Sequence, residues 1–374
     1  MRSRRVWCLI LSIGLATLGI LALLTQLDAL HVTAQGTDWA WPLTADGRSR
    51  FAGWSPDGHT VLVNRWGAVV GEGSTRQMLS ELWAVNALGG QATKLSGNAV
   101  QPAYAANGQR LAYLAFAGDG RDGRWEARVL DLVSGQEKSW GTADWQMPPA
   151  WIGETLAFAQ DGKVWLSSEG VTAMSADLPT LPSGARVRLA ADGTRAAWSD
   201  GTHLWVVPHP GAEPRLLAGP RPQPLSQSWE RGANTRVLNF TWSPDGRRLA
   251  YVVAVESPSP ELWVADVNGD QAPVLLVQGQ AELFSAPSWS PDGRTLAFSR
   301  TPLGAATASA SDIWLVNADG ENLRPLLRND LEESSPAWSP DGRYLAFNRG
   351  GDVWVLDVTR AAISFPPDRG QVRG

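Results

Sequence analysis

The chain has 374 residues, of which 44% are hydrophobic and 18% are charged, so its apolar content is too high for a disordered protein. The 38 glycines and 25 prolines make up about one residue in six, which argues against long helices and favours many short strands joined by turns. The formal net charge of −5 argues against a protein that binds nucleic acid. The single cysteine, Cys8, lies in the N-terminal apolar run, which excludes disulfides and cysteine zinc sites from the rest of the chain.

The N-terminal segment has the pattern of an export signal. Three arginines among the first five residues precede an uncharged apolar run at residues 6–24, and basic residues stay on the cytoplasmic side of a membrane. The rest of the chain is therefore predicted to be exported. The run is long enough to span a bilayer, and small residues suited to signal peptidase end at Ala34. Residues 1–34 are either a retained anchor, with membrane contact through residues 6–24, or a signal peptide whose cleavage after Ala34 leaves a periplasmic or secreted protein.

A five-residue motif recurs along the remainder of the chain. Trp-Ser-Pro-Asp-Gly begins at Trp54, Trp242, Trp289 and Trp338, and each copy is followed by a short apolar run and then by a second run built on tryptophan. Weaker copies fill the gap, and the seven anchors lie near residues 54, 104, 151, 189, 242, 289 and 338. Spacings of this size are typical of four-stranded propeller blades.

The residues of the motif predict a hairpin turn. Proline pre-sets the first corner, aspartate fits the second, and glycine takes the left-handed position that closes the hairpin. The motif therefore joins two antiparallel strands, A and B. The apolar runs are continuous rather than alternating, as in strands that are buried on both faces. Strand C carries the second tryptophan, and a turn such as Asn317–Gly320 leads on to strand D, for example Arg324–Leu327.

These patterns predict an all-β fold: a seven-bladed β-propeller of four-stranded antiparallel blades over residues 35–368, after one N-terminal apolar helix and before a tail at 369–374. Six or eight blades fit the spacing less well. Both chain ends must complete one blade, because an open sheet edge promotes aggregation. Trp39–Thr44 resembles a displaced strand D and is our preferred closing strand, while Ala361–Phe365 is the competing candidate.

At these residues the chain resembles the TolB-type β-propeller repeat, a WD-repeat-like family whose signature is P-x-W-S-P-D-G followed by an I/L-A-F/Y strand. The resemblance covers about residues 40–360, with four units matching almost letter for letter and the third and fourth matching weakly. TolB itself carries an α/β domain before its propeller, whereas about 20 residues separate the apolar segment from the first unit here. The resemblance therefore implies the fold but does not transfer the whole role of TolB.

Motifs for catalysis, phosphate binding and metal binding are missing from the sequence, which contains no H-E-x-x-H, Walker-type loop or G-x-S-x-G. Some relatives in the family, the oligogalacturonate lyases, look like propellers that hold a metal through a histidine cluster. The four histidines here are scattered, at His31, His59, His203 and His209. We therefore expect neither a metal nor a cofactor.

Tryptophan gives the best indication of a binding surface. Twelve of the 20 tryptophans fall in strands A to C, where they are expected to pack between blades. In an up-and-down blade the B–C and D–A connections share one face, and here they are long: residues 66–80, 116–124, 140–147, 219–233 and 301–311. Loops on a rigid scaffold often bind ligands, and tryptophan and arginine are common at binding hot spots. The candidate residues are Trp66, Trp140, Trp145, Trp229, Arg121, Arg124 and Arg231. The alternative is that these indoles pack beneath their own loops.

Taken together, the sequence favours a non-enzymatic, monomeric binding scaffold outside the cytoplasmic membrane, which recognises an envelope protein, peptide or glycan. The alternative is an envelope polysaccharide hydrolase or lyase with a site at the mouth of the central channel. The enzyme hypothesis requires a pair of carboxyl groups roughly 5–9.5 Å apart in the channel. A third possibility is a sensor or assembly subunit that acts through a retained membrane segment.

Overall fold

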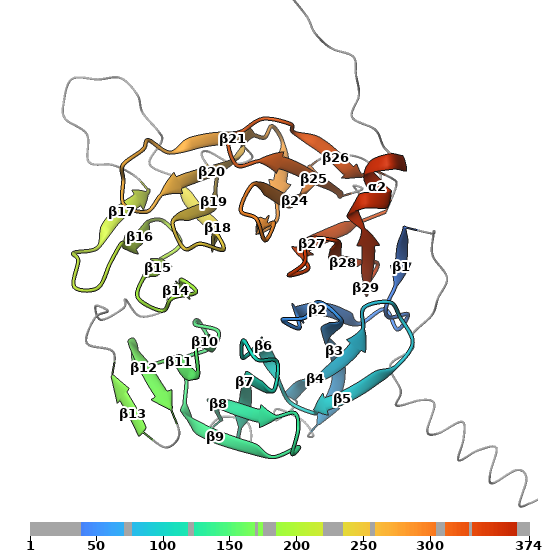
Figure 1. Ribbon diagram of the computed structural model, residues 1–374, viewed down its shortest axis with the longest axis vertical. Helices are drawn as coiled ribbons and strands as arrows, with labels where there is room; N and C mark the ends of the chain where they lie inside the picture. The colour runs from blue at the N-terminus through green and yellow to red at the C-terminus, as the bar shows by residue number, and fades with distance from the viewer. Residues whose placement is uncertain are drawn as a thin grey trace, which may run out of the picture.

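The computed structural model describes residues 39–70, 77–118, 123–168, 171–174, 185–219, 235–254, 259–303, 311–328 and 331–364. Seven antiparallel sheets stand around a common axis like the blades of a propeller, which confirms the predicted all-β, seven-bladed fold (Figure 1). The predicted apolar helix at residues 6–24 lies outside the described residues. Within the described ranges, no helix combines the length and the apolar character needed to cross a bilayer.

Blades I to IV follow one another along the chain, each with strands A to D running from the axis outward. Blade I contains β2 (Ser49–Trp54), β3 (Thr60–Val70), β4 (Gln77–Asn86) and β5 (Ala92–Ser96). Blade II contains β6 (Val100–Tyr104), β7 (Arg110–Ala117), β8 (Arg124–Asp131) and β9 (Glu137–Thr142). Blade III contains β10 (Ala150–Ile152), β11 (Thr155–Gln160), β12 (Lys163–Ser168) and β13 (Val171–Met174). Blade IV contains β14 (Arg186–Leu189), β15 (Ala196–Ser199), β16 (Leu204–Val207) and β17 (Arg215–Ala218).

Blades V to VII complete the ring. Blade V contains β18 (Arg236–Trp242), β19 (Arg248–Ala254), β20 (Pro260–Asp266) and β21 (Val274–Gln278). The inner strand of blade VI is in two pieces, β22 (Glu282–Phe284) and β23 (Ser288–Trp289), followed by β24 (Thr295–Pro302), β25 (Asp312–Asn317) and β26 (Arg324–Leu327). Blade VII contains β27 (Glu333–Trp338), β28 (Tyr344–Arg349), β29 (Asp352–Asp357) and, as its outer strand, β1 (Ala40–Pro42). Helix α2 (Val358–Ser364) follows β29.

The N-terminal strand closes the ring. Strand β1 pairs antiparallel with β29, so the blue and red ends of the chain lie side by side in Figure 1. Fully buried Thr44 strengthens this junction, because its hydroxyl donates to Asp352 Oδ1 and accepts from the Val353 N–H, both at 2.9 Å. The preferred closing strand is confirmed. The competing candidate is wrong, since residues 361–364 belong to α2 and join no sheet.

The Ser-Pro-Asp-Gly motif forms the predicted turn, and its side chains hold it together. In blade I the Ser55 hydroxyl donates to Asp57 Oδ1 at 2.5 Å, and the same oxygen accepts from the His59 N–H at 3.0 Å. The Ser55 oxygen in turn accepts from the Thr60 N–H at 2.9 Å, while Gly58 adopts a left-handed φ of 72°. The same three bonds recur in blades V, VI and VII. Each copy of the motif therefore starts strand B in the same way.

The core lies between the blades rather than in one central mass. Seven buried hydrophobic clusters occupy the seven junctions between neighbouring blades, so strands B and C are covered on both faces as their continuous apolar runs predict. Four of the five strand A indoles also cross these junctions, because their Nε1–H groups donate to carbonyls in the preceding blade. These pairs are Trp54 to Ala337 (3.1 Å), Trp151 to Ala103 (3.0 Å), Trp242 to Arg188 (3.0 Å) and Trp289 to Thr241 (3.4 Å).

Candidate functional site

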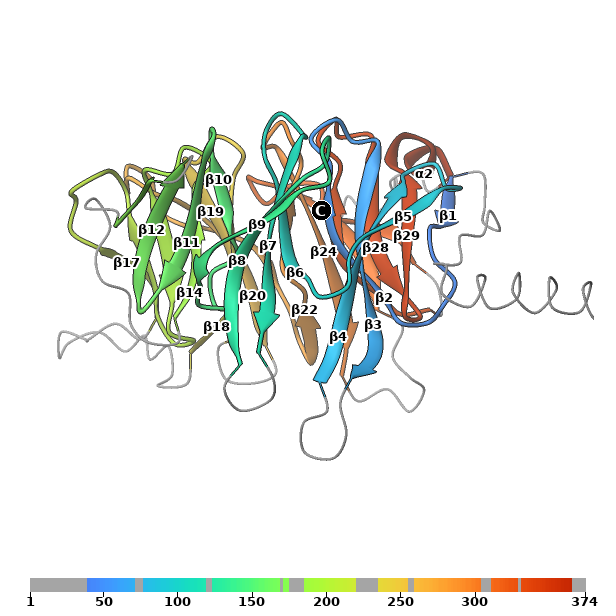
Figure 2. The ribbon, with the colours of Figure 1, turned by 90° about the horizontal axis from the view of Figure 1, so that it is seen from below.

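The strand order separates the connections onto two faces. Because the four strands of a blade alternate in direction, the A–B and C–D turns emerge on one face, which we call the hairpin face. The B–C and D–A connections emerge on the other, the loop face, which is the lower one in Figure 2. The loop face is the one that the sequence assigns to binding.

Four of the seven predicted binding residues lie within the described part of the chain. Two of the tryptophans are exposed, Trp145 at 56% and Trp66 at 37%. The Arg124 side chain is also exposed, at 66%, and Trp140 is half-buried. The other three, Arg121, Trp229 and Arg231, lie outside the described residues. A binding role for any of the seven stays a prediction.

Trp145 sits on a fixed backbone in the D–A connection between blades II and III. The Gln101 side-chain amide donates to the Trp145 carbonyl oxygen at 3.0 Å, from a strand A residue with a left-handed φ of 52°. On either side, the Asp144 N–H donates to the Ala159 carbonyl at 2.7 Å, and Met147 is buried. The exposed indole is therefore presented by a segment that both blades hold in place, which lowers the entropy that a ligand must overcome.

Trp66 occupies a paired strand rather than a loop. The sequence places residues 66–80 in a connection, but β3 and β4 continue beyond the rim of the blade and pair from Trp66 opposite Ser80 to Val70 opposite Gln77. The Trp66 N–H also donates to the Arg48 carbonyl at 2.9 Å. The expected loop is thus partly a hairpin, and it holds Trp66 beside the D–A connection that leads into blade I.

Trp140 takes a packing role. Its ring lies against the hydrophobic cluster between blades II and III, and the Lys138 ammonium lies 5.6 Å from the ring centroid. The buried Nε1–H finds no hydrogen-bond partner among the described residues. For this residue the structure agrees with the alternative in which the indole packs beneath its own connection.

Arg124 belongs to a charged group on blade II. Its guanidinium lies 3.4 Å from the Glu126 carboxylate, which also accepts from Arg128 at 3.2 Å and from the Ser139 hydroxyl at 3.2 Å. Burial alone raises the pKa of Glu126, but these hydrogen bonds and the positive charge of Arg128 outweigh it, so the pKa falls below its ordinary value. Glu126 is therefore ionised at neutral pH and holds the arginines near the loop face.

The structure contains a row of arginine–carboxylate pairs that the sequence did not predict. In three consecutive blades, VI, VII and I, an arginine late in strand B pairs with a carboxylate on or before strand A. The pairs are Arg300 with Glu282 (2.7 Å), Arg349 with Glu333 (2.9 Å) and Arg65 with Asp46 (3.0 Å). Arg300 and Arg349 also stack over the strand C indoles of their own blades, at 4.6 and 4.3 Å. The arginine recurs near the end of strand B in the sequence. Its carboxylate partners follow only from which residues of strands A and B lie opposite each other.

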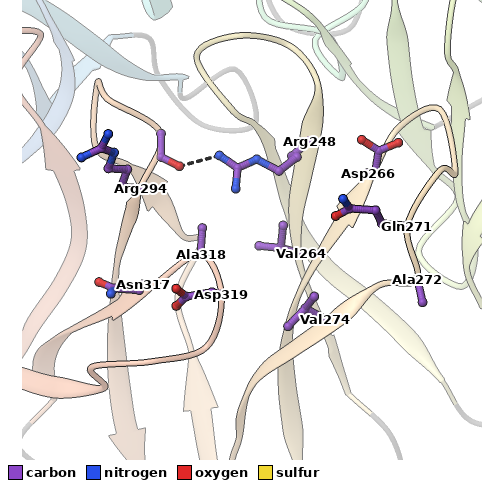
Figure 3. A pocket seen from close by; sticks show the side chains of 11 residues that line it. Arg248, Val264, Asp266, Gln271, Ala272, Val274, Arg294, Asn317, Ala318 and Asp319 are labelled. Carbon is purple, nitrogen blue, oxygen red and sulfur yellow. Dashed lines mark hydrogen bonds between the residues drawn. The ribbon is translucent and has the colours of Figure 1, made fainter.

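The hairpin face carries two grooves where the sequence suggests only stereotyped turns. One, of about 490 Å³, lies between blades V and VI, lined by Arg248, Asp266, Gln271 and Asp319 among others (Figure 3). The other, of about 500 Å³, lies between blades I and II around Asp57, Thr60 and Tyr104. Both are open inter-blade spaces rather than enclosed cavities.

The described residues contain no group of three or more histidine, cysteine, aspartate and glutamate side chains placed to hold a metal ion. Of the histidines near strand C of blade IV, His203 lies with Nδ1 3.0 Å from Asp200 Oδ2, and His209 Nδ1 lies 3.2 Å from the Pro210 carbonyl. Both side chains thus contact their own local segments.

The repeat family is identified by comparison with known proteins. Residues 219–362 match the family described as the TolB beta propeller domain, and this range contains every strand of blades V and VI and the three strands β27 to β29 of blade VII. Residues 219–362 belong to the TolB-type β-propeller repeat family. The resemblance drawn from the Trp-Ser-Pro-Asp-Gly units is thereby confirmed. The match covers three of the four units that carry the complete Trp-Ser-Pro-Asp-Gly motif, and the copy that begins at Trp54 lies outside it.

The chain is similar to one curated TolB protein over a short segment, and it shares its fold with several solved structures. The Tol-Pal system protein TolB of Alcanivorax borkumensis is 34% identical over 65 residues, which are 17% of this chain and only 14% of that protein. An oligogalacturonate lyase solved in complex with manganese superposes with a TM-score of 0.57 at 13% identity, over 88% of this chain and 96% of the lyase. The Cps50 (Swd1) β-propeller domain of Myceliophteria thermophila gives 0.55 at 13% identity, over 84% and 98%. At such identities the solved structures share the fold alone.

Proposed function

We propose that this TolB-like propeller is a non-enzymatic binding scaffold that recognises an envelope protein, peptide or glycan through its loop face. The observation that carries the proposal is the exposed indole of Trp145 on a backbone held by Gln101 at 3.0 Å. Trp66 and Arg124 add a second exposed indole and a cation on the same face. Rigid aromatic anchors with an adjacent arginine are the usual composition of a binding hot spot.

The arginine–carboxylate pairs favour binding over catalysis. A hydrolase or lyase at the channel mouth needs a carboxyl group that is free to donate or accept a proton. Glu282, Glu333 and Asp46, at the loop-face ends of the inner strands, are each held by an arginine at 3.0 Å or less. In each pair the arginine already occupies the carboxylate, so these groups suit a rigid recognition surface better than an acid–base pair.

Export is part of the same proposal. The apolar run at residues 6–24 with its arginine flank would carry the propeller across the cytoplasmic membrane, either as a retained anchor or as a cleaved signal. Cell fractionation tests this part separately, because recovery of the protein in the cytosol contradicts it.

A capture experiment from envelope extract tests the binding surface. The double variant Trp66→Ala, Trp145→Ala removes both exposed indoles, and each such loss is expected to cost about 1–2 kcal/mol of binding, so capture should fall by about tenfold or more. The matched control is Leu88→Ala, Val133→Ala, which removes exposed apolar side chains, 69% and 78% exposed, from the hairpin face. Capture of the same molecules in the same amount by the folded tryptophan variant would overturn the proposal.

A further inference from the structure

An arginine bridges the blades on the hairpin face between blades V and VI. Arg248 begins strand B of blade V, and its Nη2 donates to the Gly293 carbonyl in the first turn of blade VI at 2.6 Å (Figure 3). Its guanidinium carbon also lies 4.9 Å from the centroid of the Trp289 ring. The guanidinium therefore joins a strand A aromatic ring to the turn that follows it.

The same bridge occurs at two further junctions. Arg110 of blade II stacks over Trp151 of blade III at 4.7 Å and forms an ion pair with Glu154. Arg195 of blade IV donates through Nη1 to the Gly246 carbonyl of blade V. Three of the seven junctions thus use an arginine at or directly before the start of strand B.

The junction between blades I and II keeps the frame of this bridge but lacks the arginine. Thr60 begins strand B there, and Tyr104 supplies the strand A ring. The groove of about 500 Å³ lies where those three junctions hold a guanidinium. A Cβ placed on Gly108, in the turn after the ring, would meet only Pro56 within 4 Å. Blades III and VI also have a threonine at this position. After blade III, Ile152 packs against Gly193 and takes up the space, and after blade VI a Cβ placed on Gly342 would meet Pro291 at 3.5 Å.

The polar groups that line this groove complement a guanidinium. Asp57 is its one charged lining residue, and Oδ1 of that carboxylate already accepts two hydrogen bonds within its turn. Asp57 Oδ2, Thr60 Oγ1 and Tyr104 Oη make no hydrogen bond to any residue that the structure describes. The Ser55 hydrogen bond keeps the pKa of Asp57 below its ordinary value, whereas burial and the nearby Asp57 charge raise the pKa of Tyr104 to about 12. The groove thus offers an anion, two hydroxyl groups and an aromatic ring.

We propose that this groove binds the arginine side chain of a partner polypeptide, which takes the place that Arg248 occupies between blades V and VI. The guanidinium stacks on Tyr104, pairs with Asp57 and reaches the turn at Gly108, which lines the groove. Arginine suits the site because its planar group stacks and donates hydrogen bonds at the same time, whatever the pH. This site lies on the hairpin face and does not depend on the proposed loop-face function.

Titration of the full chain with N-acetyl-arginine amide, followed by ¹H–¹⁵N NMR, tests the proposal. A single side chain is expected to bind saturably with a dissociation constant of about 1–10 mM and to shift the signals of blades I and II. The neutral isostere N-acetyl-citrulline amide should bind about tenfold more weakly, because it loses the ion pair. Absence of saturable shifts, or equal binding of the two compounds, overturns the proposal.

Two variants place the binding in the groove. Thr60→Arg supplies the missing bridge from within the chain and should abolish binding, whereas Thr295→Arg adds the same charge at the equivalent position of blade VI and should leave it unchanged. Asp57→Asn should weaken binding about tenfold, while Asp292→Asn, the same change in another turn, should not. Asparagine preserves the turn, since Asn107 Oδ1 accepts the equivalent backbone bond in blade II at 3.0 Å. Undiminished binding by Thr60→Arg would contradict the assignment.

Discussion

Trp54 shows how one side chain joins the beginning of the ring to its end. Its indole Nε1–H donates to the Ala337 carbonyl of blade VII at 3.1 Å, and its ring packs in the cluster between blades VII and I. Trp338 occupies the same repeat position one blade earlier, but its buried Nε1–H has no hydrogen-bond partner among the described residues. The two tryptophans thus have similar packing and differ in one hydrogen bond.

This difference gives a matched pair of substitutions. Trp54→Phe removes the hydrogen bond to the Ala337 carbonyl, so the free energy of unfolding should fall by about 0.5–1.5 kcal/mol beyond the cost of the smaller ring. Trp338→Phe loses the same ring volume together with an unsatisfied buried N–H, so it should cost less or nothing. Urea unfolding of both variants measures the difference. An equal loss in the two would mean that the bond to Ala337 contributes nothing.

At the scale of the element, the Ser-Pro-Asp-Gly turn is a small acid-sensitive unit. The Ser290 hydroxyl and then the Arg294 N–H hold the pKa of Asp292 below its ordinary value, and Ser55 and His59 do the same for Asp57. A carboxyl group with a lower pKa in the folded protein than in the unfolded chain stabilises the fold above its unfolded pKa. That stabilisation is lost as the pH falls through the folded pKa.

The unfolding free energy should therefore decline as the pH drops below about 4, where unfolded aspartate begins to bind protons. Asp292→Asn removes one such carboxyl group while keeping an acceptor oxygen for the turn, so the decline should become shallower without a large loss at pH 7. Urea unfolding at a series of pH values from about 3 to 7 measures both slopes. The idea fails if the variant and the native protein lose stability equally steeply.

Elements of this kind explain which features of the protein could be predicted from its sequence. The turn at Ser55 and the strand that carries Trp83 are encoded by adjacent residues and repeated, so local chemistry identified them. The contact from Gln101 to Trp145 was not predictable, because it joins two blades and depends on a register shift in strand A between Val100 and Ala103. The pairing of Arg349 with Glu333 likewise depends on which residues face each other across two strands.

At the scale of the whole molecule, stability depends on closing the ring with β1. Ala40 and Leu43 are buried in the clusters on either side of blade VII, and Thr44 bonds to both Asp352 and Val353. Without these residues β29 becomes an open edge, with the backbone of its Leu356 and Val355 no longer paired with β1. Open edges of this kind pair with other chains.

A chain that begins at residue 45 should therefore be much less stable than one that begins at residue 35. Losing fully buried Leu43 alone removes an interaction of the size that costs about 2–5 kcal/mol in large-to-small core substitutions, and the hydrogen bonds of Thr44 add to it. The shorter chain should also associate in a concentration-dependent way through the exposed β29 edge. Urea unfolding and size-exclusion chromatography at two protein concentrations measure these effects.

The full-length variant Thr44→Val separates the closing contacts from the loss of chain. Valine keeps the shape of the side chain but can neither donate to Asp352 nor accept from the Val353 N–H, which leaves a buried donor unsatisfied at a cost of about 1–3 kcal/mol. This variant should be destabilised yet remain monomeric, because β1 still covers the edge of β29. If the chain beginning at residue 45 were as stable and as monomeric as the longer one, ring closure by β1 would not be what holds the propeller together.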